Sequence, residues 1–175
     1  MSAPYSHVVR VEAIPEEGQT VLLAANAAER QALASFYRLP SIEALGASLE
    51  LRHAAQGGVR VTGAVHGVVT QICVISLEPF QAPVDEEIDV RFAPRDPVEQ
   101  NARRNVLQTF TMSDEDEPDP IVEGKIDIGA LTAEFFALGL DPYPRKPGAT
   151  FKFEPDRSET VSPFSALAGR GWKWD

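Results

Sequence analysis

The sequence contains one cysteine and no long apolar run. A single cysteine cannot form an intramolecular disulfide, and the first residues show neither the basic nor the apolar segment of a secretion signal. No stretch approaches the roughly 18 uninterrupted apolar residues that a membrane-spanning helix needs. These absences predict a soluble cytoplasmic protein with no membrane partner.

Basic residues are also scarce relative to acidic ones. The chain has 16 Lys and Arg against 26 Asp and Glu, which gives a formal net charge of −10. This charge repels phosphate backbones and disfavours direct binding to DNA or naked RNA. A basic protein partner is therefore expected.

The strong signatures of catalysis are missing as well. The sequence has no glycine-rich phosphate loop, no paired-histidine metal motif and no nucleophile elbow. Its histidines are scattered, and His66 would face away from Cys73 on one strand. No catalytic, cofactor-binding or metal-binding residue is assigned, and a non-enzyme is expected. A small-ligand binder, or a thiol- or metal-dependent protein centred near Cys73, remains the alternative.

The most informative segment is Cys-Val-Ile-Ser-Leu-Glu-Pro-Phe at residues 73–80. It looks like a Cys-x-x-Cys zinc or redox knuckle in which Ser76 replaces the second sulfur. Either the segment is a structural turn, or it descends from a motif that used both thiols. Because Cys73 falls on the apolar register of the preceding strand, its sulfur is expected to pack in the core.

The N-terminal third predicts strands at residues 7–11 and 20–24 and then a helix at 27–37. Asn26 and Glu29 form a capping-box pattern at the helix start, and Pro40 follows its end. Leu33, Phe36 and Tyr37 are spaced to share one helix face, which should dock on a sheet.

The middle of the chain predicts an antiparallel sheet. Alternating residues from Ala47 lead to a turn at residues 56–58 and to a second arm at 59–73, whose odd-numbered residues share one face. Residues 77–83, with prolines near both ends, predict a turn. A strand at 84–92 follows, with Ile88, Val90 and Phe92 facing inward.

The C-terminal half alternates between charged and apolar segments. The acidic run at residues 114–119 predicts a mobile excursion at about 95–120, with one weak helical turn near 101–107. Asp127 caps a predicted helix at 128–138, in which Leu131, Phe135 and Leu138 share a face and Gly139 marks the end. The three prolines in residues 141–148 predict a stiff exposed arm.

Together these elements predict an α+β protein with a central antiparallel sheet, or a partly closed barrel, against which the helices at 27–37 and 128–138 pack. One domain is expected at residues 1–155, followed by a C-terminal tail at 156–175 with a short helix at 163–168.

Several of these motifs resemble the YceD-like family of large ribosomal RNA subunit accumulation proteins over about residues 59–147. The resemblance lies in residues 73–80, the strand after them and the acidic excursion at about 95–120. It continues in the stretch from Ile-Asp-Ile at 126–128 to Leu-Asp-Pro-Tyr-Pro-Arg at 140–145. The ending Ser-Pro-Phe-Ser-Ala-Leu-Ala at 162–168 is similar to the alphaproteobacterial branch. The family pattern is Cys-x-Arg-Cys-Leu-x-Pro-Phe, so Cys73, Leu77, Pro79 and Phe80 match it, whereas Ile75 and Ser76 replace its arginine and second cysteine.

The resemblance implies a cytoplasmic, non-catalytic factor for accumulation or processing of large-subunit ribosomal RNA. Given the acidic charge, we expect contact with a ribosomal protein or assembly factor of the large subunit, and only indirect association with the RNA. The expected contact surface combines residues 77–80 with residues 141–146 of the proline-rich arm. The motif residues assigned to interaction are Cys73, Leu77, Glu78, Pro79, Phe80, Asp127, Asp141, Pro142, Tyr143, Pro144 and Arg145.

Overall fold

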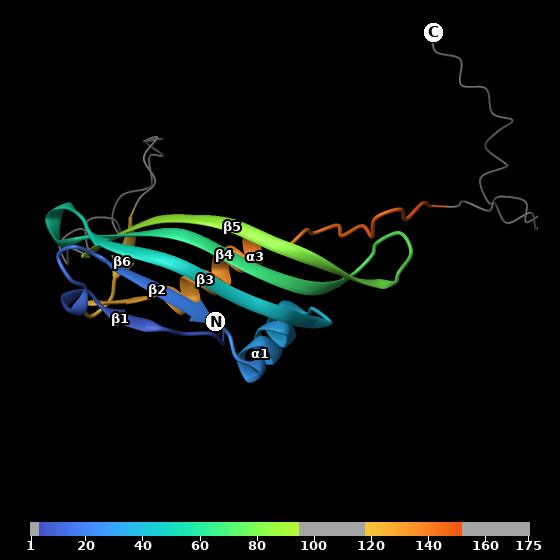
Figure 1. Ribbon diagram of the computed structural model, residues 1–175, viewed down its shortest axis with the longest axis horizontal. Coiled ribbons are helices and arrows are strands. Elements are labelled where there is room, and N and C mark those ends of the chain that lie inside the picture. Colours follow the sequence, from blue (N-terminus) through green and yellow to red (C-terminus); the bar gives the residue numbers. More distant parts are fainter. Residues whose placement is uncertain (1–3, 95–117, 152–175) are drawn as a thin grey trace, which may run out of the picture.

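The computed structural model describes residues 4–94 and 118–151, and the fold is α+β. Five strands form an open sheet in the order β2-β3-β4-β5-β6, and β1 pairs with β7 in a separate two-stranded ribbon. The strands are β1 (Val8–Arg10), β2 (Gln19–Ala24), β3 (Ser41–His53), β4 (Val59–Ile72), β5 (Pro79–Pro94), β6 (Asp119–Ile121) and β7 (Lys125–Asp127). The antiparallel sheet of the prediction is confirmed, and in the described residues it is an open sheet rather than a barrel (Figure 1).

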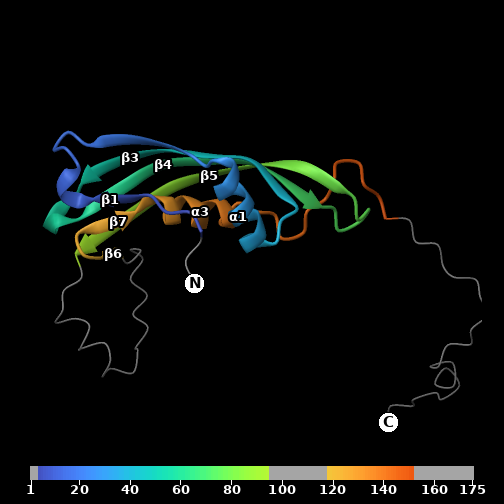
Figure 2. The same ribbon diagram turned by 90° about the horizontal axis from the view of Figure 1, so that it is seen from below.

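Two helices, α1 (Ala27–Tyr37) and α3 (Ile128–Leu138), cover one face of this sheet (Figure 2). They also contact each other, because the Tyr37 hydroxyl donates to the Ala133 carbonyl oxygen at 2.8 Å. Both predicted helix ranges and both predicted caps are confirmed. The Asn26 side chain accepts from the Ala28 and Glu29 N–H groups, and Glu29 accepts from the Asn26 N–H.

The alternation of buried and exposed residues along the strands places the hydrophobic core between the sheet and the two helices. The odd-numbered register of β4 faces the helices, as predicted, and the inward residues of β5 do so too. The fully buried side chains include Leu33, Leu49, Leu51, Val59, Val61, Val65, Val69, Ile128 and Phe136. No described helix or strand covers the opposite face, where Leu22 is 78% exposed.

The helix faces differ from the prediction. In α3 the buried side is built around Phe136, whereas Leu138 is 69% exposed. In α1 Leu33 is buried, but Phe36 is 43% exposed. Apolar residues occur all around α3, so the spacing of its apolar side chains is compatible with more than one buried face. Packing against β4 and β5 determines which face is buried.

Two strands also begin earlier than predicted. β3 begins at Ser41 rather than near Ala47, because a bulge between Ile42 and Ala44 breaks the alternation. β5 begins at Pro79, inside the predicted turn at residues 77–83. Before Phe92 it pairs only with β4 among the described strands, and an edge strand tolerates proline.

The third correction concerns the predicted acidic excursion. Its last residues, Asp119 and Pro120, belong to β6, which pairs in parallel with residues 92–94 of β5. Residues 95–117 of that excursion, including the predicted helical turn at 101–107, lie outside the described residues. So does the predicted C-terminal tail.

Candidate functional site: the Cys73 turn and the arm docked on it

The turn between β4 and β5 is organised around the Cys73 sulfur. The thiol accepts the N–H groups of Ile75 and Ser76, each at 3.4 Å, and the Leu77 N–H donates to the Cys73 carbonyl oxygen at 2.9 Å. Leu77 adopts a left-handed conformation with φ of 58°. These bonds close a tight loop whose centre is the sulfur and whose tip is Leu77.

The segment at residues 141–148, called the arm below, docks on this turn (Figure 1). The Val74 N–H donates to the Pro144 carbonyl oxygen at 2.9 Å, and the Lys146 N–H donates to Cys73 Sγ at 3.3 Å. The buried Gln71 side chain donates to the Asp141 carbonyl oxygen at 3.1 Å. In all three bonds the arm contributes a main-chain group, and together they fix the arm to the end of the sheet. Because main-chain groups are common to every residue type, the sequence of the arm does not predict these contacts.

Cys73 is buried, as predicted, but its sulfur does more than fill core space. Hydrogen bonds from the Ser76 hydroxyl and N–H, and then from the Lys146 and Ile75 N–H groups, outweigh the effect of burial. Together they lower the pKa of the thiol from 9.0 to about 7. Ser76 thus occupies the second-cysteine position of the family pattern, and it donates hydrogen bonds to the Cys73 sulfur.

The structure gives no further ligands for a metal at this turn. No group of three or more His, Cys, Asp or Glu side chains in the described part of the chain is arranged to hold a metal ion. His66 is exposed and pairs with Asp85 at 2.7 Å, on the strand register opposite to that of Cys73.

An ion pair between the arm and the turn completes their contact. Lys146 Nζ lies 2.8 Å from Glu78 Oε2, and this pair lowers the pKa of Glu78 and raises that of Lys146. Both side chains remain partly exposed, so the pair positions the arm more than it stabilises the fold.

Most of the predicted interaction residues gather on the surface that these contacts create. Leu77 is 74% exposed and Tyr143 is 71% exposed. Glu78, Pro79, Asp141, Pro142 and Arg145 are also exposed, whereas Phe80 and Pro144 are partly buried. The sequence placed Lys146 in the arm but did not predict its contact with Cys73, and no local pattern pointed to Gln71.

Asp127 lies elsewhere, at the opposite end of α3 from the arm. Its carboxylate accepts the Gly129 and Ala130 N–H groups at the helix start. It also accepts from the Ser6 hydroxyl at 2.6 Å and the His7 N–H at 2.8 Å. The structure therefore places Asp127 where it joins the N-terminal segment to α3, apart from the other motif residues.

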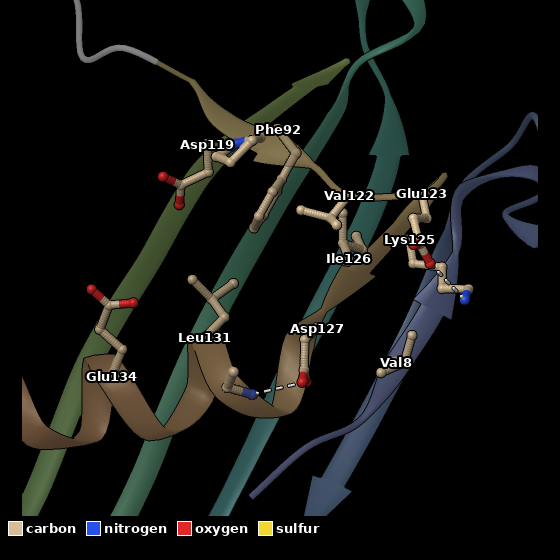
Figure 3. A pocket seen from close by; sticks show the side chains of 12 residues that line it. Val8, Phe92, Asp119, Val122, Glu123, Lys125, Ile126, Asp127, Leu131 and Glu134 are labelled. Carbon is tan, nitrogen blue, oxygen red and sulfur yellow. Dashed lines mark hydrogen bonds and ion pairs between the residues drawn. The ribbon is translucent and has the colours of Figure 1, made fainter. Parts of the chain in front are cut away.

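A pocket of about 420 Å³ lies beside Asp127, between the first turns of α3, the β6–β7 connection and the end of β5. Its lining residues are Val8, Phe92, Asp119, Pro120, Val122, Glu123, Lys125, Ile126, Asp127, Ala130, Leu131 and Glu134 (Figure 3). No sequence pattern indicated this pocket, because its walls come from three distant stretches of the chain, at Val8, at Phe92 and at residues 119–134.

The fold and these contacts define a small α+β protein whose arm is hydrogen-bonded to the turn between β4 and β5. The chain belongs to the family described as large ribosomal RNA subunit accumulation protein YceD, whose family model matches residues 61–169, more than half of the sequence. That range includes both the Cys73 turn and the arm, so the predicted family is confirmed. No curated protein and no solved structure matched the chain.

The described residues contain no helix that is both long and apolar enough to cross a membrane.

Proposed function

We propose that this protein is a non-catalytic, cytoplasmic factor of ribosome biogenesis that supports accumulation or processing of large-subunit ribosomal RNA. Membership of a family described by that role supports the proposal. The net charge of −10 favours protein contacts on pre-ribosomal particles over direct coating of RNA phosphates.

The contact surface in this proposal is the Cys73 turn together with the arm. The observation that supports it is that hydrogen bonds join these two segments. The Leu77 and Tyr143 side chains on the joined surface are 74% and 71% exposed to solvent. An exposed aromatic side chain beside an arginine is typical of residues that dominate binding interfaces. Arg145 follows Tyr143 by two residues and has no ion-pair partner among the described residues.

The test is sedimentation of the full-length protein with large-subunit precursors from growing cells. Tyr143→Ala combined with Arg145→Ala should reduce the co-sedimenting fraction several-fold, because hot-spot truncations cost about 2 kcal/mol or more. Leu22→Ala combined with Arg91→Ala, on the open sheet face, is the matched control and should sediment normally. Unchanged sedimentation of the arm variant would show that the surface is wrong.

A parallel pull-down separates protein contacts from RNA contacts. RNase treatment before capture should leave the bound ribosomal protein or assembly factor in place if protein contacts hold the complex. Loss of all large-subunit partners after RNase would mean that RNA is the primary ligand, against the proposal.

The alternative is a thiol-dependent protein centred on Cys73, favoured only by the low pKa of that thiol. It predicts that Cys73→Ala abolishes function in a strain that depends on the protein. Under the assembly-factor proposal, Cys73→Ala weakens arm docking but leaves partial function.

A further inference from the structure

The pocket at the start of α3 combines an apolar floor with an acidic rim. Figure 3 shows Phe92, Val122, Ile126 and Leu131 directed into it, and Asp119 and Glu134 together on one side. Its volume of about 420 Å³ falls in the range of sites that hold a small ligand or one large side chain. Val122 and Val8, at its mouth, are 61% and 53% exposed.

The four carboxylates around the pocket differ in what they already bind. Asp127 caps α3, and Glu123 lies 3.7 Å from Lys125. Asp119 and Glu134 are exposed and have no ion-pair partner within the described ranges 4–94 and 118–151. Two carboxylates next to an apolar cavity thus have no cationic partner among the residues that the structure describes.

We infer that this pocket docks a basic segment of a protein partner, with one aromatic or aliphatic side chain in the cavity and flanking Lys or Arg residues against Asp119 and Glu134. The charge argument selects this occupant. Residues 114–117 of the chain's own acidic run would add like charges to the rim, and an anionic ligand would meet the same repulsion.

The pocket is separate from the arm, since it lies at the opposite end of α3. The inference rests on the proposed function only for the source of the partner, because ribosomal proteins supply basic segments. Peptide binding can be measured without ribosomes, so its failure is distinguishable from a failure of the proposed role.

The probe is the blocked peptide Lys-Lys-Trp-Lys-Lys, titrated into the full-length protein by calorimetry and by amide NMR. We expect binding that weakens as ionic strength rises, with shifts at Val122, Lys125 and Leu131. Lys-Lys-Ser-Lys-Lys, which lacks the apolar anchor, and Glu-Glu-Trp-Glu-Glu, which reverses the charge, should bind much more weakly. Equal binding of either control peptide would overturn the inference.

Variants locate the site. Asp119→Lys combined with Glu134→Lys should weaken binding by about two- to thirty-fold, as expected for loss of two exposed ion pairs. Glu87→Lys on the open sheet face is the matched control and should bind like the wild type. An undiminished affinity of the double variant would reject the pocket as the site.

One competing occupant lies within the chain. The sequence Arg-Gly-Trp-Lys-Trp at residues 170–174 has the same basic and aromatic chemistry. If replacing Trp172 and Trp174 by serine strengthens peptide binding, the chain's own terminus fills the pocket and a partner segment does not. An unchanged affinity supports docking of a partner.

Discussion

Lys146 contacts the Cys73 turn twice, through its main-chain N–H to Cys73 Sγ at 3.3 Å and through its ammonium group to Glu78 at 2.8 Å. One contact is made by the main chain and the other by the side chain, and together they hold the arm where β4 turns into β5. This relationship makes arm docking dependent on the protonation of Glu78.

Acid should therefore loosen the arm. Lys146 lowers the pKa of Glu78 below 4.5, so the carboxylate contributes above its unfolded pKa and loses its contribution as pH falls through the folded pKa. Hydrogen exchange at the Val74 and Lys146 amides should accelerate, beyond the intrinsic pH dependence, as pH falls below about 4.5. In Glu78→Gln this acid step should be absent. An identical step in Glu78→Gln would assign it to another group.

The Cys73 thiol should titrate near neutrality. Because the Ser76 hydroxyl is the first contributor to its lowered pKa of about 7, Ser76→Ala should raise that pKa towards 9. Thiolate absorbance followed against pH measures both values. An unshifted titration in Ser76→Ala would leave the main-chain N–H groups as the sole cause.

The same thiol links stability to pH. A lowered folded pKa means that the thiolate stabilises the fold above the unfolded pKa, and that this contribution is lost as pH falls from about 9 to about 7. The difference in melting temperature between wild type and Cys73→Ala should therefore be larger at the alkaline end of this range.

Local interactions were predictable from the sequence. The caps at Asn26 and Asp127 depend on hydrogen bonds to residues two or three positions away, so their residue types mark the helix starts. The odd-numbered face of β4 followed from strict alternation with no bulge. The family motif at residues 73–80 was likewise readable as one continuous segment.

Contacts between distant segments were not predictable. The bond from Lys146 to Cys73 spans 73 positions, and no periodicity relates the two residues. The pocket joins β1 and β5 to the continuous stretch of β6, β7 and α3, and only the folded topology brings these three regions together. The bulge at Glu43 concealed the first residues of β3, because it reversed the inward and outward pattern.

Asp127 should contribute to stability through capping. Replacing it by alanine removes the acceptor for Gly129, Ala130, Ser6 and His7, and should lower the free energy of unfolding by about 0.5–2 kcal/mol. Asp127→Asn retains one acceptor oxygen and should lose less. Denaturant unfolding measures both variants.

The Asp127 carboxylate should also make the stability of the protein depend on pH. Burial raises its pKa, but hydrogen bonds from Ser6, Ala130, His7 and Gly129 outweigh burial and lower it below 3.8. Its stabilisation is therefore present above 3.8 and lost as pH falls through the lower folded value. Asp127→Asn should reduce the steepness of acid unfolding in that range; an unchanged acid limb would contradict this assignment.

Gly67 is required by the Phe136 ring. A Cβ added to Gly67 would lie 2.6 Å from Phe136 Cε2 and 3.1 Å from the Ala44 carbonyl oxygen, and Phe136 is fully buried. Gly67→Ala should therefore destabilise the protein by about 1–3 kcal/mol, the range for overpacked cores. Urea unfolding measures this effect. If the urea dependence of the unfolding free energy keeps its slope, the substitution lowers stability without changing the cooperativity of unfolding.

A double-mutant cycle identifies the ring as the cause. Phe136→Leu removes the ring atoms that the new methyl group meets, so Gly67→Ala should cost at least about 0.5 kcal/mol less in that background. Ser48→Ala, on the open face of the sheet, is the control, and its effect should be the same in both backgrounds to within about 0.5 kcal/mol. If Gly67→Ala costs the same with leucine at position 136, the Ala44 carbonyl and not the ring excludes a side chain there.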